Sequence, residues 1–379
     1  MFAGTDRIYA LMMLPYVLSG LLDISWFYFG IEKFRLTVSV NTAIKILNVI
    51  CVFVFVHKKE DLWIYCLIMS CGFLLSQLAL WIPLKKYARL IKVSFSEVLA
   101  HLKPMLVLFV PAIAVSLYKY MDKIMIGSMS GKVQLGFYEN AEKVINLPVT
   151  IISAFGTVML PKMSSIVKDD RSVSLKYIDI SMEFVMCLAI GMAFGLGAVG
   201  TIFAPVFWGK EFAASGKLIL GLSTTIPFIA FANVIRTQYL IPNCEDKIYL
   251  TSVTAGALVN LLMNAILIPK LGAFGAMIGT ILAETCVCLI QTFCVKKELP
   301  VKRYARGSLY YLPMGILMFA ITFLIGNRLG NHIYTLIIQF VAGTATYGGM
   351  CFAYFAATKN QYVLSAISRV TAVLKKKKR

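Results

Sequence analysis

Residues 62–84 read LWIYCLIMSCGFLLSQLALWIPL and contain no charged side chain. A helix gains about 1.5 Å per residue, so roughly 20 apolar residues cross the hydrocarbon core of a bilayer. This stretch therefore predicts a transmembrane helix. The composition of the whole chain agrees, because 59% of its 379 residues are hydrophobic and only 15% are charged. A soluble domain usually carries roughly 25% charged residues.

Ten further segments of this kind flank the first one on both sides. The predicted spans run approximately over 8–29, 36–56, 62–84, 104–126, 135–160, 178–205, 218–240, 249–269, 272–295, 309–327 and 333–357. The sequence thus predicts an all-α, polytopic bundle of about 11 transmembrane helices. The first span lacks a basic leader and a small-residue cleavage site, so we interpret it as a span and not as a signal peptide.

The basic residues predict the orientation of these spans. Alternate loops together with the C-terminal tail hold 24 of the 37 lysines and arginines, and the opposite set of loops holds 8. Basic loops stay in the cytoplasm, which places the C-terminus there. The chain ends in Lys375-Lys376-Lys377-Lys378-Arg379, and its net charge is +19. Charge clustered between apolar spans fits anionic membrane lipids as partners and not nucleic acid.

The spans predict a division of the chain into five parts. Residues 1–85 hold three spans and 104–297 hold six. Residues 298–358 hold two C-terminal spans, and 359–379 form a basic cytoplasmic tail. Between the first two parts, residues 86–103 carry apolar and basic positions that suit a linker helix lying in the cytoplasmic interface. An odd number of spans places Met1 on the outer side, which predicts a missing N-terminal piece that also has an odd number of spans.

Charged residues inside the spans are the candidates for function, since a charge at the bilayer centre costs roughly 2.5–3.5 kcal/mol on insertion scales. Cations in a cavity would attract an anionic group such as a pyrophosphate. The predicted substrate-binding residues are Lys45, Lys119, Lys123, Lys143 and Arg236. An alternative is that Asp122 with Lys119, and Glu139 with Lys143, are neutralising pairs that hold helices together. The carboxylates that could couple transport to a proton or sodium ion are Asp122, Glu142 and Glu284.

The sequence carries no signature of an enzyme or a cofactor site. It lacks the HExxH, GxSxG, Walker A and DxD motifs, and its predicted outer loops are short. Nine cysteines form no CxxC pair and mostly lie in apolar runs, where cysteine acts as a small packing residue. Only three histidines occur, near the ends of spans. We therefore expect neither an enzyme, nor a cofactor, nor a metal site.

Four stretches resemble a known family, and one of them is residues 157–164, which read TVMLPKMS. Residues 23–34 read DISWFYFGIEKF, residues 116–127 read SLYKYMDKIMIG, and residues 135–141 read LGFYENA. They resemble bacterial polysaccharide repeat-unit flippases of the Wzx type, within the multidrug/oligosaccharidyl-lipid/polysaccharide exporter superfamily. The chain matches the family's spans four to fourteen, so the first three are absent. By this resemblance, residues 1–85 are a partial first lobe and 104–297 a second lobe.

The resemblance implies a transporter that works by alternating access. Its substrate would be an undecaprenyl-pyrophosphate-linked oligosaccharide, moved from the cytoplasmic to the outer leaflet of the bacterial inner membrane for capsule, O-antigen or exopolysaccharide synthesis. Other polysaccharide assembly proteins would then be partners. Two alternatives remain open at this point, namely a drug or metabolite antiporter of the same superfamily and an inactive truncated remnant.

Overall fold

The computed structural model describes residues 5–88, 94, 96–97, 99, 102, 105 and 120–358. Within these residues the regular elements are helices, and ten helical stretches are long and apolar enough to cross a membrane. The predicted all-α transmembrane bundle is thus confirmed. The eleventh predicted span, 104–126, lies mostly outside the described residues. So do most of the predicted linker helix at 86–103 and the whole tail at 359–379.

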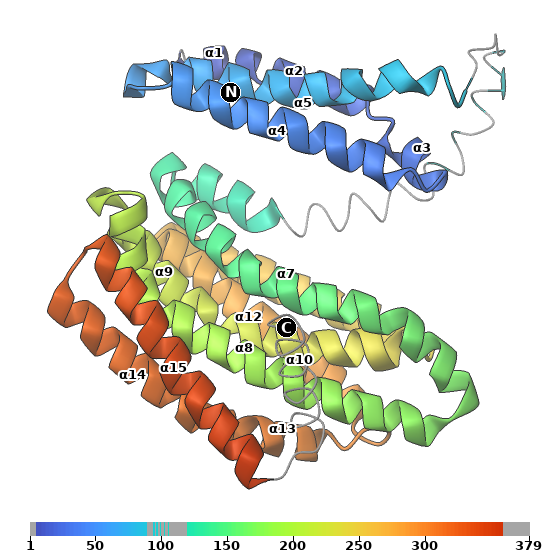
Figure 1. Ribbon diagram of the computed structural model, residues 1–379, viewed down its shortest axis with the longest axis vertical. Coiled ribbons are helices and arrows are strands. Elements are labelled where there is room, and N and C mark those ends of the chain that lie inside the picture. Colours follow the sequence, from blue (N-terminus) through green and yellow to red (C-terminus); the bar gives the residue numbers. More distant parts are fainter. Residues whose placement is uncertain are drawn as a thin grey trace, which may run out of the picture. The chain divides into compact units, whose positions relative to one another are not determined.

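The chain divides into two compact units, Met1–Leu106 and Val107–Arg379. Unit 1 contains three of the ten membrane-length stretches (Figure 1). Its helices are α1 (Thr5–Met12), α2 (Leu14–Leu21), α3 (Ser25–Gly30), α4 (Phe34–Phe55), the 3₁₀ turn η1 (Lys59–Asp61) and α5 (Leu62–Leu84). The first stretch is interrupted because Pro15 lies in the first turn of α2 and lacks the N–H that a continuous helix would use.

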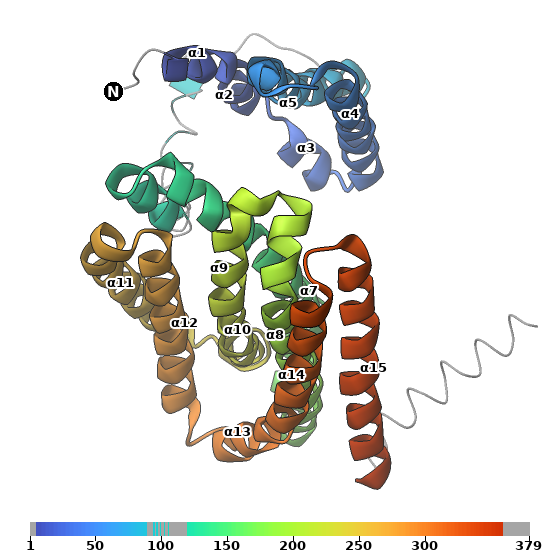
Figure 2. The same ribbon diagram turned by 90° about the vertical axis from the view of Figure 1, so that its left-hand side faces the viewer.

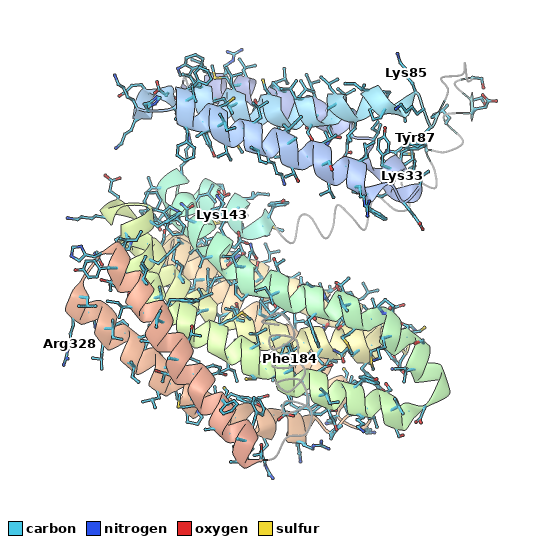
Figure 3. The ribbon with its side chains drawn as sticks, viewed as in Figure 1. Lys33, Lys85, Tyr87, Lys143, Phe184 and Arg328 are labelled. Atoms are coloured by element: carbon cyan, nitrogen blue, oxygen red, sulfur yellow. The ribbon has the colours of Figure 1, made fainter. Side chains whose placement is uncertain are left out.

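Helix α5 organises unit 1, because α2 and α4 both pack against it. The Tyr28 ring is fully buried, and its hydroxyl donates a 2.7 Å hydrogen bond to the Leu80 carbonyl. Ser70 donates to the Met12 carbonyl at 2.7 Å. Lys33 and Lys85 lie near the same end of unit 1, as the antiparallel course of α4 and α5 requires (Figure 3).

Unit 2 holds the remaining seven stretches (Figure 2). Residues 120–129 are helical. The elements that follow are α7 (Lys132–Asp169), α8 (Arg171–Phe207), η2 (Lys210–Phe212), α9 (Ala213–Ser223), α10 (Thr225–Ile235), the π-helical turn η3 (Arg236–Leu240), α11 (Asp246–Leu271), α12 (Ala273–Val295), α13 (Val301–Leu309), α14 (Tyr311–Leu329) and α15 (Ile333–Ala357). Helix α8 contacts α7, α9, α10, α14 and α15, so it forms the centre of the unit.

Two predicted spans differ in detail from the structure. The stretch 218–240 is not one helix but α9, α10 and η3, because Pro227 has no N–H to bond the carbonyl of Ser223, where α9 ends. The span predicted at 135–160 is part of α7, which has 38 residues. Hydropathy marks where the apolar run ends, whereas the backbone hydrogen bonds of a helix continue equally well into polar surroundings.

Helices α11 and α12 form a tight hairpin that two glycines permit. Gly272 joins them with φ of 60°, a backbone conformation that side chains disfavour. A Cβ atom at Gly275 would lie 2.5 Å from the backbone carbonyl carbon of Leu267. Small residues therefore let the two backbones approach closely, as is common between membrane helices.

Candidate functional site

A partly buried polar network joins four helical segments of unit 2 at Asp122. Its Oδ2 accepts hydrogen bonds from the Tyr138 hydroxyl at 2.9 Å and from the Thr280 hydroxyl at 3.0 Å. Its Oδ1 accepts from the Asn264 amide at 2.5 Å. Asp122 lies in the helical residues 120–129, and its partners come from α7, α11 and α12. The Asp122 carboxylate is thus held by neutral donors from three other helices.

Oxygen atoms outnumber donor hydrogens in this network. The Tyr138 and Thr280 hydroxyl oxygens are also 2.9 Å from each other, and the Thr280 hydroxyl lies 2.9 Å from the Ala276 carbonyl. The Asn264 amide nitrogen is also 3.1 Å from the Asn260 side-chain oxygen. The Asn264 side-chain oxygen is buried, and the described part of the chain gives it no hydrogen-bond partner. Such a set of oxygens is the kind of environment that hard cations favour.

Two ion pairs beside the network involve α7, one with the helical residues 120–129 and one within α7 itself. Lys123 and Glu142 are 2.9 Å apart, and about a quarter of each side chain is exposed. Lys143 pairs with Glu139 at 3.4 Å within the helix, at the surface of the unit (Figure 3). Because Lys123 faces Glu142, the negative charge of Asp122 is stabilised by hydrogen bonds to neutral groups and not by this neighbouring lysine.

The hydrogen bonds given above for the Asp122 network involve none of the other predicted residues. Lys45 is exposed on α4 of unit 1, and Lys119 lies outside the described residues. The Arg236 guanidinium lies 5.6 Å from the centre of the Tyr249 ring, and its buried Nε has no hydrogen-bond partner among the described residues. Glu284 is partly buried on α12. The substrate-binding and ion-coupling roles of the eight predicted residues stay predictions.

Sequence reasoning found Asp122 but missed its partners. Tyr138, Asn264 and Thr280 are neutral, so a search for charges inside spans passes over them. One signal was available, because Asn260 and Asn264 are four residues apart in an apolar span and share one helix face. Which helices face Asp122 depends on tertiary packing between segments up to 158 residues apart in the sequence.

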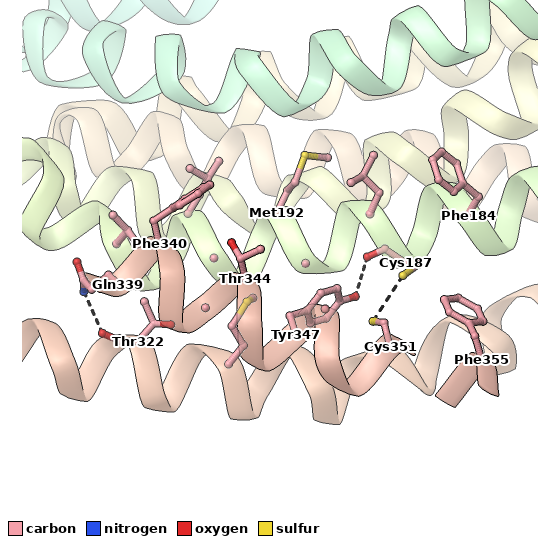
Figure 4. Close-up of a pocket in the computed structure, with 18 of the residues that line it drawn as sticks. Phe184, Cys187, Met192, Thr322, Gln339, Phe340, Thr344, Tyr347, Cys351 and Phe355 are labelled. Atoms are coloured by element: carbon pink, nitrogen blue, oxygen red, sulfur yellow. Dashed lines mark hydrogen bonds between the residues drawn. The ribbon is translucent and has the colours of Figure 1, made fainter. Parts of the chain in front are cut away.

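A second feature of unit 2 is an apolar cavity of about 1010 Å³ lined mainly by α8, α14 and α15 (Figure 4). Phe184, Phe340 and Tyr347 form part of its wall, and glycines widen it. Polar groups lie in the same lining. Gln339 donates a 2.9 Å hydrogen bond to the Thr322 carbonyl, while its own side-chain oxygen is buried without a partner in the described residues. Such a cavity suits an elongated apolar ligand with few polar groups.

Ion pairs and a helix cap fix the end of unit 2 where α7 meets α8. Asp179 pairs with Arg303 of α13 at 2.9 Å, and Arg171 pairs with Glu298. Asp170 caps α8 by accepting from the backbone N–H groups of Ser172 at 2.8 Å and Val173 at 3.3 Å. The pKa of Asp170 is lowered, chiefly by the hydrogen bond from the Ser172 side chain and then by the two backbone hydrogen bonds.

Comparisons with known proteins agree with this architecture. Residues 5–167 match the family model described as polysaccharide biosynthesis protein. The chain is 24% identical over 294 residues to a putative O-antigen transporter of Shigella dysenteriae, an alignment that covers 75% of this chain and 73% of that protein. It is also 24% identical over 242 residues to the capsular polysaccharide biosynthesis protein CapF of Staphylococcus aureus, covering 62% of this chain and 59% of that protein.

Among solved structures, the fold is similar to that of the lipid II flippase MurJ in its inward closed conformation. The TM-score is 0.67 at 18% sequence identity, and the match covers 85% of this chain and 67% of MurJ. At this level of identity the match concerns the fold. The chain spans about 59 to 73% of the length of the two curated relatives above and about two thirds of MurJ.

Proposed function

We propose that this multi-pass membrane protein, a relative of the Wzx-type polysaccharide flippases, carries a lipid-linked glycan across the bacterial inner membrane. The substrate is an undecaprenyl-pyrophosphate-linked oligosaccharide repeat unit, which moves from the cytoplasmic to the outer leaflet by alternating access. The product supplies capsule, O-antigen or exopolysaccharide synthesis. The observation that carries the proposal is the alignment of 75% of the chain with a putative O-antigen transporter.

The apolar cavity supports a substrate with a long hydrocarbon chain. Burying apolar surface is worth about 25 cal/mol per Å² in water, but a lipid chain gains little by moving from bilayer to protein. The cavity would therefore guide such a chain while polar contacts elsewhere supply the affinity. Lys123, Lys143 and Arg236 remain our candidates for the pyrophosphate, and Lys45 and Lys119 complete the proposed set.

We further propose that the Asp122 network binds the cation that drives transport. The buried oxygen of Asn264, the Asp122 carboxylate and the hydroxyls of Tyr138 and Thr280 offer several oxygens to one small cation. A monovalent cation would neutralise the carboxylate, which stabilises it away from water. Glu142 and Glu284 are the alternative coupling carboxylates.

The substrate proposal is tested by measuring undecaprenyl-linked oligosaccharide in cells that lack this gene. We expect the intermediate to accumulate on the inner leaflet and to clear when the 379-residue chain is restored. Accumulation that does not clear would mean that the chain is inactive by itself. No accumulation, in a strain with every other flippase of this type removed, would contradict the assigned substrate.

The coupling proposal is tested with the isosteric change Asp122→Asn in purified protein. Wild-type protein should gain thermal stability as sodium replaces a bulky organic cation at constant ionic strength, and the variant should lose that gain. Glu211→Gln serves as the matched control, since it removes an exposed carboxylate of η2 that has no part in the network. An unchanged sodium response in Asp122→Asn would exclude this site.

A further inference from the structure

We propose that Cys187, Met314 and Cys351 form a binding site for a soft monovalent metal ion, for which Cu(I) is the best match. The three residues come from α8, α14 and α15. The Sγ atoms of Cys187 and Cys351 are 3.7 Å apart, and the Cys351 Sγ lies 3.8 Å from the Met314 Sδ. Figure 4 shows the two cysteines pointing toward one another between α8 and α15. The observations behind this site stand apart from the proposed transport function, although both cysteines line the apolar cavity described above.

Two of the three sulfur–sulfur separations match those expected around a three-coordinate ion. Metal–thiolate bonds are about 2.3 Å long, so three sulfurs arranged evenly around one ion stand about 4 Å apart. The Cys187–Cys351 and Cys351–Met314 sulfur separations are within a few tenths of an ångström of that value. A disulfide needs its sulfurs about 2.05 Å apart, so the two Sγ atoms, now 3.7 Å apart, would have to approach by about 1.7 Å. The cluster is therefore closer to a metal site than to a cross-link.

The chemistry of the ligands favours Cu(I) over other metals. Thiolate and thioether sulfurs are soft ligands that select Cu(I), whereas structural Zn²⁺ sites use four ligands. Charge balance also favours Cu(I). One thiolate neutralises a monovalent ion, so no net charge is left among the buried apolar side chains. On binding, the thiol that becomes the thiolate releases its proton to the solvent, and no electron is transferred.

The surroundings of the cluster hold the sulfurs in place. Tyr347 is four residues before Cys351 on α15, and its hydroxyl donates a 2.6 Å hydrogen bond to the Cys187 carbonyl on α8. This bond joins the two helices beside the cluster. Cys351 is 7% exposed, and both cysteines line the apolar cavity, which gives an ion a route to them. The site is thus enclosed but reachable.

The test uses the purified full chain, reduced and in detergent, titrated with Cu(I) against a chromophoric Cu(I) chelator. We expect Cys187→Ser and Cys351→Ser to lose the tightest equivalent of Cu(I). Met314→Leu keeps the side-chain volume, so it should weaken binding and remove one sulfur from the copper X-ray absorption spectrum. Met318→Leu, one turn further along α14, and Cys288→Ser, a buried cysteine of α12, are matched controls that should bind normally.

Circular dichroism and gel filtration confirm that each variant is folded before it is titrated. Equal Cu(I) binding in both serine variants would overturn the proposal, because the ion would then sit at other cysteines. Normal binding in Met314→Leu, with an unchanged absorption spectrum, would likewise exclude the three-sulfur site. A mass loss of two hydrogens that links Cys187 to Cys351, without copper uptake by the reduced chain, would identify the pair as a disulfide instead.

Discussion

Tyr138 is the residue on which the Asp122 network depends most directly. Its ring is 1% exposed, and its hydroxyl contacts both the Asp122 carboxylate and the Thr280 hydroxyl. A hydrogen bond to a charged group contributes roughly 1.5–3 kcal/mol, and a partly buried carboxylate that loses a donor is left less well satisfied. The network therefore contributes to stability as well as to any cation site.

We predict that Tyr138→Phe lowers the free energy of unfolding by roughly 1.5–3 kcal/mol, because it removes one donor to Asp122 while keeping the ring. Reversible unfolding in mixed micelles measures the change. Tyr65→Phe is the control, since Tyr65 is 41% exposed on α5 and should change stability by less than about 0.5 kcal/mol. Equal stability of Tyr138→Phe and the unmodified protein would contradict the network.

For single residues, the sequence identified the charged side chains inside the spans but not the side chains that contact them. Asp122, Lys123 and Glu142 were singled out because charges are rare in apolar spans. Their partners could not be assigned from the sequence, since the Lys123–Glu142 pair and the three donors to Asp122 arise from how helices rotate against each other. A residue's type can be read from a single chain, but its neighbours across a helix interface require the packed structure.

The positions of neighbouring helices depend on how closely their backbones can approach each other. At Gly275 of α12 a Cβ atom would press on the backbone of α11, so Gly275→Ala requires the hairpin to open. We expect a loss of roughly 1–3 kcal/mol, as in other overpacked sites. Gly136→Ala on α7 is the matched control, because a Cβ atom there meets nothing within 4 Å. That variant should be neutral or slightly stabilised, and the same unfolding measurement distinguishes the two.

The cap of α8 predicts how stability depends on pH. The folded pKa of Asp170 is lowered, so its contribution is fully present above its unfolded pKa of about 3.9 and is lost as pH falls through the folded value. Asp170→Asn keeps a capping side chain but cannot titrate. We expect the stability difference between wild type and this variant to shrink below about pH 4. A difference that stays constant from pH 6 to pH 3 would show that Asp170 does not act as a charged cap.

For the whole molecule, hydropathy predicted ten spans that the structure confirms, because bilayer thickness sets helix length almost independently of sequence detail. It did not predict the break between α9 and α10 or the continuation of α7 beyond the apolar run, since both depend on backbone hydrogen bonds. The orientation stays a prediction from the basic loops. The division of 1–379 into five parts also stays a prediction beside the two units of the structure.

The predicted orientation is tested with fusions. A fluorescent protein that folds only in the cytoplasm should be bright when joined after residue 358, and alkaline phosphatase should be inactive there. Fusions after Gly330, in the turn between α14 and α15, should give the reverse result. Active phosphatase after residue 358 would contradict a cytoplasmic C-terminus.

The lengths of α7 and α8 have a mechanical consequence. At 1.5 Å per residue, the 38 residues of α7 extend about 57 Å, whereas the hydrocarbon core is about 30 Å thick. Even at a tilt of 40°, crossing that core takes only about 39 Å of helix. The paired helices therefore extend well beyond the hydrocarbon core, and a small rotation of unit 2 within the membrane becomes a larger displacement at Asp170, where the two helices meet.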